Sequence, residues 1–214
     1  YSLLQVMSRF GLSLGFGDKT VKEVCEMNNV DCQTFLVVVN FMAEGFSRMD
    51  GSADDISIPA LVDYLRQAHI YFLDYCLPAI RRKLIEAIDC SQDDVSFLIL
   101  KFFDGYMREV RKHMEYEEKT VFKYVDTLIH GNAPKNYQIS TFSKHHDQVG
   151  ERLTELKNII IKYCPAKANT NVLNAALFDI YACEEGLESH CKVEDYLFVP
   201  AILKLERRMR ENEK

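Results

Sequence analysis

The sequence predicts an all-α protein, an up-down-up-down four-helix bundle preceded by a small N-terminal helical domain. Apolar residues recur at steps of three and four over long segments, which is the period of an amphipathic helix. Residues that break helices are few, with five Pro and nine Gly in 214 residues. A His and a Glu four residues apart occur twice, as His113 with Glu117 and as His190 with Glu194. On a helix each pair lies on one face, one turn apart.

The small helical domain is expected over residues 1–50. Ser2 to Phe10 is apolar and helix-like, and Asp18 or Thr20 can cap a second short helix over 21–27. Asn28 and Asn29 indicate a turn, and a third helix should follow over about 32–46. Helix, turn and helix is also the outline of a DNA-binding motif. Only four Lys or Arg face six Asp or Glu in this segment, which argues against that interpretation.

A small, polar and acidic segment over 51–58 is the predicted linker, and the bundle should occupy 59–214. Ser57 is a candidate N-cap for the first bundle helix, and Pro78 should kink or interrupt it. The bundle helices are expected over about 59–88, 93–128, 139–163 and 170–210. On the second helix the predicted inner stripe begins at Phe97 and continues through Phe103 to His113 and Glu117.

Composition and charge exclude several classes of partner. The formal net charge of −6 argues against a nucleic-acid partner, since phosphate contacts need a basic surface. No apolar run approaches the roughly 20 residues of a membrane-spanning helix. The seven cysteines are odd in number and contain no C-x-x-C spacing, which fits free thiols in a reducing compartment. We therefore expect a cytoplasmic protein with no nucleic-acid and no membrane partner.

Six side chains are candidate metal ligands. His69 and His146 lie on the apolar stripes of the first and third bundle helices, and the two His-x-x-x-Glu pairs occupy the second and fourth. A buried carboxylate is costly without a cation, so two such pairs facing a core indicate metal ions. A single His on an apolar stripe is more often an ordinary core residue, and a single pair can be an exposed hydrogen bond. The predicted ligands are His69, His113, Glu117, His146, His190 and Glu194.

The depth of these residues along the bundle tests this set. His69 and His113 each lie 20 residues from the turn that joins their helices, so their levels coincide. His146 lies 17 residues before Tyr163 and His190 lies 20 after Thr170, which agrees within one turn. The levels of His113 on the second helix and His146 on the third differ by about 16 Å of helical rise. The connection over 131–140 must therefore run back along the bundle by that distance.

Other polar residues near this level receive ordinary interpretations. His145 and His146 point about 100° apart, so one of them is expected to ligate, and the apolar stripe favours His146. His130, beside Gly131, is expected to be a cap or surface residue. The tyrosines at this level, Tyr106, Tyr116 and Tyr181, are expected to pack. The remaining glutamates are expected on a solvated helix face: Glu115, Glu118, Glu184, Glu185 and Glu188.

The pattern of these residues resembles the hemerythrin-like (HHE cation-binding) domain. The resemblance covers 59 to about 206 and rests on His69, His113-Met-x-x-Glu117-Glu118, His146-Asp147-x-x-Gly150-x-x-Leu153 and His190-x-x-x-Glu194-x-x-Leu197-Phe198. It is closest to the branch that repairs iron–sulfur centres after nitrosative or oxidative damage. The resemblance implies two iron ions, a di-iron centre with an oxo or hydroxo bridge. His69 and His113 would bind one iron, His146 and His190 the other, and Glu117 and Glu194 would bridge them.

The chain departs from that branch at two places. Members carry a further His about twenty residues after the first ligand, where this chain has Cys90 and Ser91. They also carry adjacent cysteines in the N-terminal domain, whereas Cys25 and Cys32 are separated here, which puts chemistry that needs a thiol pair in doubt. Without His145 the histidines are too few for the five-histidine shell of oxygen carriers. The implied site is therefore more open and suits NO, O2 or peroxide.

Three functions follow from the resemblance, and the sequence does not decide whether the chain is an enzyme. The first is stress defence, in which the protein handles NO or reactive oxygen species and restores damaged iron–sulfur proteins. The second is a sensor or carrier of O2 or NO that acts through a partner. The third is a metal-dependent oxidase or peroxidase. The sequence assigns no residue to a catalytic role other than metal binding.

Overall fold

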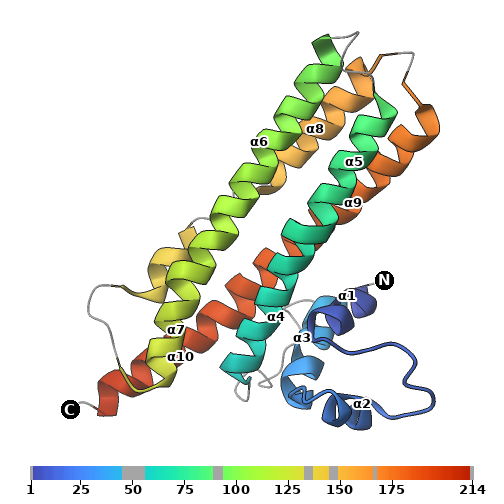
Figure 1. The fold of residues 1–214 in the computed structure, drawn as a ribbon. Helices are drawn as coiled ribbons and strands as arrows, with labels where there is room; N and C mark the ends of the chain where they lie inside the picture. Colours follow the sequence, from blue (N-terminus) through green and yellow to red (C-terminus); the bar gives the residue numbers. More distant parts are fainter. Residues whose placement is uncertain are drawn as a thin grey trace. The chain divides into compact units, whose positions relative to one another are not determined.

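The computed structural model of the chain describes residues 2–44, 56–88, 94–132, 137–144, 149–165 and 168–212. Every regular element in these ranges is helical, and no strand occurs among them (Figure 1). The all-α class predicted from the spacing of apolar residues is confirmed. No helix in the described part of the chain has both the length and the apolar character needed to cross a membrane.

The chain forms two compact units, of which the first contains Tyr1–Ala68, Thr120–Ser143 and Ser189–Lys214, and the second contains His69–Lys119 and Lys144–Glu188. The predicted boundaries, a domain over 1–50, a linker over 51–58 and a bundle over 59–214, stay a prediction. Most of the predicted linker, residues 51–55, lies outside the described residues.

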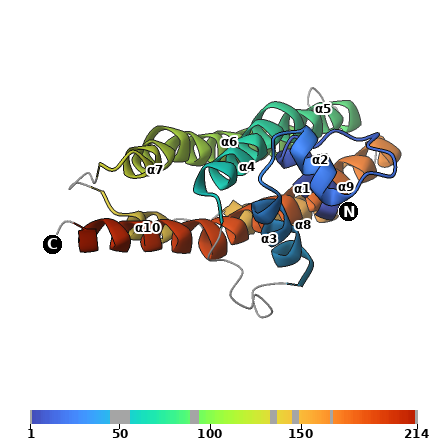
Figure 2. The same ribbon diagram turned by 90° about the horizontal axis from the view of Figure 1, so that it is seen from below.

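In the first unit, three short helices form the N-terminal segment: α1 (Ser2–Arg9), α2 (Val21–Met27) and α3 (Cys32–Glu44) (Figures 1 and 2). Thr20 caps α2 as predicted, because its hydroxyl accepts from the Glu23 N–H at 3.3 Å and the Glu23 carboxylate accepts from the Thr20 N–H at 2.7 Å. Hydrogen bonds from Thr20 hold the pKa of Glu23 below its ordinary value. The predicted turn is present, with Asn29 at a φ of 54°.

Cys25 on α2 and Cys32 at the start of α3 lie on either side of the asparagine turn. Burial and, after it, the neighbouring Cys32 side chain raise the pKa of Cys25 to about 11. The two cysteines are not adjacent in the sequence, so this segment has no vicinal thiols, as stated above. The chain reverses at the asparagine turn, where the Val30 N–H donates to the Cys25 carbonyl at 2.9 Å.

The N-terminal helices pack on α4 (Ile58–Ile70), the first long helix. Ser57 is its N-cap as predicted, since its hydroxyl accepts from the Ala60 N–H at 3.4 Å. Arg9 donates to the Tyr64 hydroxyl at 3.3 Å, and the Phe10 ring lies 4.9 Å from the Tyr64 ring. Tyr64 is fully buried, so α4 depends on the N-terminal segment to cover this face.

The rest of the first unit contains α7 (Phe122–Ile129), α10 (Val199–Asn212) and a 3-10 segment, η5 (Ile139–Lys144). A buried carboxylate joins them, because Glu206 Oε1 on α10 accepts from the Tyr124 hydroxyl at 2.6 Å and from the Ile139 N–H at 3.0 Å. The third bundle helix was expected to begin as an α-helix near 139, and the structure corrects this to a 3-10 turn. The Ile139 amide is held by Glu206 there rather than by an upstream carbonyl.

The second unit contains η3 (Tyr71–Cys76), α5 (Leu77–Ala87), α6 (Asp94–Tyr116), α8 (Val149–Tyr163) and most of α9 (Thr170–Val193). Their apolar side chains form its core, including Leu84, Ile99, Phe103, Leu156 and Ile180, each fully buried. Figures 1 and 2 show α5 beside α6 and α9. Ion pairs join them, since Arg81 contacts Asp104 at 2.6 Å and Lys83 contacts Asp179 at 2.5 Å.

Phe97 does not lie on the inner stripe of α6, and that prediction is wrong. Its side chain is exposed, whereas Ser96 and Ile99 are buried. The inner face therefore starts one position earlier than the hydrophobic pattern indicated, and a small polar residue takes the place expected for an aromatic ring.

Three π-helical turns interrupt the long helices: η3 after α4, η4 (Glu117–Val121) after α6, and η6 (Glu194–Phe198) after α9. In η3 and η6 the backbone N–H that follows the turn donates to the carbonyl five residues earlier. The Leu77 N–H donates to the Phe72 carbonyl, and the Val199 N–H donates to the Glu194 carbonyl. A proline follows each of these two amides, at Pro78 and Pro200. Proline cannot donate to the carbonyl four residues back and clashes with it, and a wider turn relieves that clash. Pro78 therefore widens its helix and does not end it.

Candidate metal centre

In the second unit, one buried carboxylate contacts two imidazoles. Glu117, at the first position of the π turn η4, is fully buried. Its Oε2 lies 2.8 Å from Nε2 of His69, and its Oε1 lies 2.7 Å from Nε2 of His113. The His69 side chain is 4% exposed and that of His113 is 15% exposed, so His113 is the more accessible of the two histidines. Both oxygens of one carboxylate thus lie beside imidazole nitrogens able to bind a metal.

Glu118 has a role that the sequence did not indicate. It was expected on the solvated face, but its Oε1 lies 3.0 Å from Nδ1 of His69. The side chain is 36% exposed, so this carboxylate stands between the site and solvent. A carboxylate on the second nitrogen of an imidazole fixes the ring orientation and leaves the first nitrogen to bind a cation. The adjacent acidic pair in the sequence was the available signal, because only one of two neighbouring residues can point into the core.

In the first unit, the second His and Glu pair shows a similar arrangement. His190 is the fourth residue from the end of α9, and Glu194 is the first residue of the π turn η6. Nε2 of His190 lies 3.4 Å from Oε1 of Glu194, and their side chains are 1% and 0% exposed. Both glutamates therefore begin a π turn, and both lie four residues after a histidine. Wide turns of this kind are found frequently at functional sites.

His69, Glu117, His190 and Glu194 form a buried cluster in which the ligand atoms that they offer all lie within 4.8 Å of one another. Ligands about 2.1 Å from one cation lie roughly 3 to 4 Å from each other, so the spread of these four atoms fits metal binding. Two buried carboxylates in this cluster also carry negative charge that a cation would balance. Imidazole and carboxylate donors together suit iron, zinc or manganese.

Two of the predicted ligands are not among these four residues. His113 joins the cluster through Glu117, at the 2.7 Å contact described above. His146 lies outside the described residues, as does His145, and both stay predictions. His130 is exposed and is the C-cap residue of α7, as predicted.

Among the tyrosines near this level, Tyr106 is buried as expected, whereas Tyr181 is 49% exposed. Lys157 Nζ lies 4.1 Å from the Tyr181 ring centre and contacts the Glu184 carboxylate. Glu184 also accepts from the Thr154 hydroxyl at 2.7 Å. The prediction that Glu184 only faces solvent is therefore wrong, since it joins α9 to α8.

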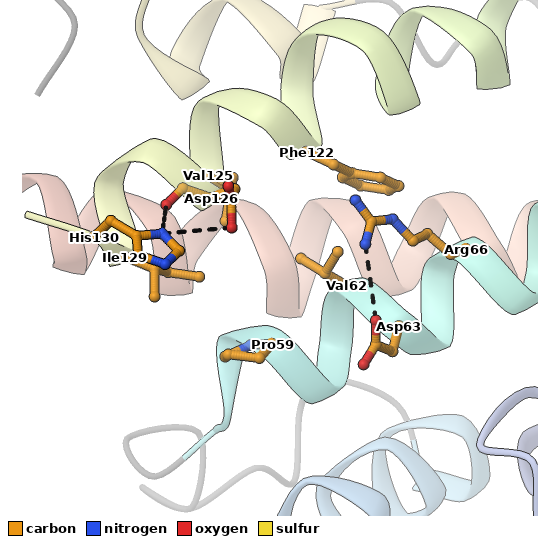
Figure 3. A pocket seen from close by; sticks show the side chains of 9 residues that line it. All are labelled: Pro59, Val62, Asp63, Arg66, Phe122, Val125, Asp126, Ile129 and His130. Atoms are coloured by element: carbon orange, nitrogen blue, oxygen red, sulfur yellow. Dashed lines mark hydrogen bonds and ion pairs between the residues drawn. The ribbon is translucent and has the colours of Figure 1, made fainter. Parts of the chain in front are cut away.

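A separate surface pocket of about 270 Å³ lies between α4 and α7 in the first unit. Figure 3 shows Arg66 near the Phe122 ring, with Asp63 beside its guanidinium group and His130 beside Asp126. The guanidinium carbon is 5.5 Å from the ring centre, a cation–π distance. None of the five predicted metal ligands that the structure describes lines this pocket.

These features define a class of protein, a helical bundle with a buried cation-binding cluster of histidine and glutamate. The sequence profile of the hemerythrin HHE cation-binding domain matches residues 60–202, which is more than half of the chain. The chain belongs to this family, and its fold is an all-α bundle of the hemerythrin-like type. No curated protein matches the chain in a sequence comparison.

Proposed function

We propose that this chain is a non-haem di-iron protein of the cytoplasm that acts in defence against nitrosative and oxidative stress. The observation that carries the proposal is the buried cluster of His69, Glu117, His190 and Glu194. Glu117 and Glu194 would bridge two irons, and His69, His113, His146 and His190 would be terminal ligands. When bound, the iron pair supplies reversible binding and redox chemistry toward NO, O2 or peroxide.

Other side chains of the protein hold the ligands in the orientation that metal binding requires. Glu118 holds the His69 ring through Nδ1, so that Nε2 is directed toward Glu117. Apolar residues three or four positions from the ligands along each helix are buried, among them Leu65, Phe72, Val121 and Leu197, and this burial supports a site that excludes water. The partial exposure of His113 supports entry of a small ligand beside this residue.

The histidine inventory supports an open site rather than an oxygen carrier. The chain has six histidines, and His130 is exposed at the end of α7. Five histidine ligands would therefore require both His145 and His146, which are adjacent and point about 100° apart on a helix. A shell with fewer histidines leaves positions for NO or peroxide. Repair of damaged iron–sulfur proteins is the particular role that we propose for this reactivity.

Metal content and the optical spectrum of the oxidised protein test the di-iron proposal. We expect two irons per chain with ferric absorption, and a loss of iron in Glu117→Gln and in Glu194→Gln. His130→Ala is the matched control, because it removes an exposed histidine and should leave the iron content unchanged. One metal per chain, or an equal loss of iron in the control, would contradict the proposal.

The stress-defence role is tested separately on the iron-loaded protein. An iron–sulfur enzyme inactivated by NO or peroxide should recover activity when this chain is present, and the Glu117→Gln variant should not restore it. If the loaded protein has two irons and gives no recovery, the repair role fails while the di-iron site stands.

One observation favours a sensor as the second candidate function. The N-terminal helices contact Tyr64 through Arg9 and Phe10, and Tyr64 is on α4, the helix that also carries His69. A change at His69 could therefore alter how the N-terminal segment packs. In that case NO binding should change the rate of proteolysis within residues 1–44, whereas a repair protein without sensing should show the same rate with and without NO.

A further inference from the structure

The surface pocket between α4 and α7 has an apolar inner lining and polar side chains at both ends (Figure 3). Val62, Phe122 and Val125 line it and are buried, and Pro59 and Ile129 complete the apolar part. At about 270 Å³ the pocket has room for roughly nine water molecules at about 30 Å³ each. That volume suits the body of a small organic molecule rather than a single ion.

At one end of the pocket, Asp126 and His130 offer hydrogen-bond acceptors (Figure 3). Nδ1 of His130 lies 2.8 Å from the backbone carbonyl of Asp126, and a carbonyl oxygen can only accept, so Nδ1 carries the hydrogen. In the neutral ring Nε2 is then an acceptor. The Asp126 carboxylate is a second acceptor beside the same ring, with Oδ1 3.5 Å from Nδ1. This end therefore suits a ligand that brings N–H donors.

At the other end of the pocket, the charge of Arg66 is offset within the protein. Its guanidinium carbon lies 5.5 Å from the Phe122 ring centre, and its Nη1 lies 3.9 Å from the Asp63 carboxylate. The lining contains two carboxylates and one guanidinium, which leaves a formal charge of −1 with His130 neutral. Because Asp63 is beside Arg66, the excess negative charge lies at the end formed by Asp126 and His130.

We propose that this pocket binds a small organic cation, a primary amine carried on an aromatic body. The ammonium group donates to the Asp126 carboxylate and to Nε2 of His130, since one charge and several N–H donors complement both acceptors. The aromatic body contacts the apolar lining at Val62, Val125 and Ile129. The whole lining belongs to the first unit and contains none of the described metal ligands, so the proposal does not depend on iron binding.

Titration calorimetry of the full chain with 2-phenylethylamine tests the proposal. We expect one site per chain with a dissociation constant of about 1 mM or below. 3-Phenylpropionate has the same ring and the opposite charge, and it should bind at least about fivefold more weakly. Nα-acetyllysine amide presents the ammonium group of a protein side chain and covers less of the apolar lining, so its binding should also be at least about fivefold weaker. Either compound binding as tightly as 2-phenylethylamine, or no saturable binding of the amine, would overturn the proposal.

Two variants locate the bound amine in this pocket. Asp126→Asn removes the charge at nearly constant size and should weaken binding about fivefold, and Ile129→Ala shortens the apolar lining and should weaken it about threefold. The Asp126 side chain is 71% exposed, so its replacement should leave the fold intact, which circular dichroism checks. Glu115→Gln is the matched control, because it neutralises an exposed carboxylate outside the pocket and should keep the wild-type affinity. Wild-type affinity in Asp126→Asn, as expected if the amine binds elsewhere, or an equal loss in the control would overturn the proposal.

Discussion

At the scale of single residues, the site depends on which of two neighbouring glutamates is buried. Glu117 is fully buried against His69 and His113, and Glu118 reaches Nδ1 of His69 from a partly exposed position. One carboxylate thus contacts the nitrogens that would bind metal, and the next orients one of those rings. Neighbouring acidic residues in the sequence have two different physical roles here.

Replacing Glu118 should weaken metal binding without unfolding the protein. In Glu118→Ala the His69 ring loses its partner at Nδ1, and the affinity for metal should fall by about 10- to 100-fold. Competition with a chelator measures this change. Glu115→Ala is the matched control on the same helix, since Glu115 forms an exposed ion pair with Lys119 at 2.7 Å. An equal effect of both substitutions would mean that general charge, and not ring orientation, sets the affinity.

At the scale of elements, π turns at the metal ligands connect the long helices along the chain, and Glu206 on α10 holds α7 and η5 against it. The prolines after η3 and η6 provide a sequence signal for two of the π turns. No proline follows η4, so the wide turn at Glu117 has no equivalent signal in the sequence. We infer that burial of the Glu117 carboxylate beside His69 stabilises that turn.

Deleting Lys119 tests the role of η4. A π turn contains one more residue than an α turn, so removing the exposed Lys119 should leave a regular α-helix with its register preserved on both sides. We expect a folded protein whose metal content falls, because Glu117 is no longer directed by the wide turn. The control is deletion of Lys112 in the regular part of α6, which shifts the register of every following residue and should strongly destabilise the protein. Thermal unfolding and metal analysis distinguish these results, and full metal content after the Lys119 deletion would contradict the role of the π turn.

Replacing Glu206 should loosen the contact among α7, α10 and η5. Glu206→Ala leaves the Tyr124 hydroxyl and the Ile139 N–H without this acceptor, and the free energy of unfolding should fall by about 2 to 4 kcal/mol. Urea unfolding measures the loss. Tyr124→Phe removes one of the two bonds and should cost less, about 1 to 2 kcal/mol. If the two variants lose the same stability, the bond to Ile139 contributes nothing.

At the scale of the whole molecule, metal binding and folding should be strongly linked. Glu117 and Glu194 place two fully buried carboxylates in the cluster, and their charge opposes folding when no cation is present. Binding of metal to the folded chain alone adds about 4 kcal/mol when free metal exceeds its dissociation constant a thousandfold. The stability of this protein should therefore depend on metal supply.

Replacing both buried glutamates by glutamine should make the protein more stable than the wild type without metal and less stable than the wild type with iron. Without metal, the double variant Glu117→Gln and Glu194→Gln should unfold at a higher temperature than the wild type, because two buried charges are gone. With iron present the wild type should be the more stable protein. Scanning calorimetry with and without a chelator measures both differences. A wild type that is more stable than the variant under both conditions would indicate an imidazolium–carboxylate network in place of a metal site.

The helices and their family were available from the sequence because they depend on local patterns. Apolar spacing predicted the long helices, and the spacing of His and Glu predicted the paired ligands. The positions of Thr20 and Ser57 predicted two caps that the structure contains. Each of these signals is a repeat or a neighbour relation within a few residues, which one helix determines by itself.

Only the tertiary structure decided which polar side chains turn inward. It buried Ser96 and exposed Phe97, directed Glu118 to His69 and tied Glu184 to α8. These outcomes depend on what lies opposite each residue in space, and on the cost of burying a charge or a thiol without a partner. The sequence by itself determined the helical fold and the kinds of ligand. Packing between elements determined the contacts that orient them, because those contacts join residues far apart in the chain.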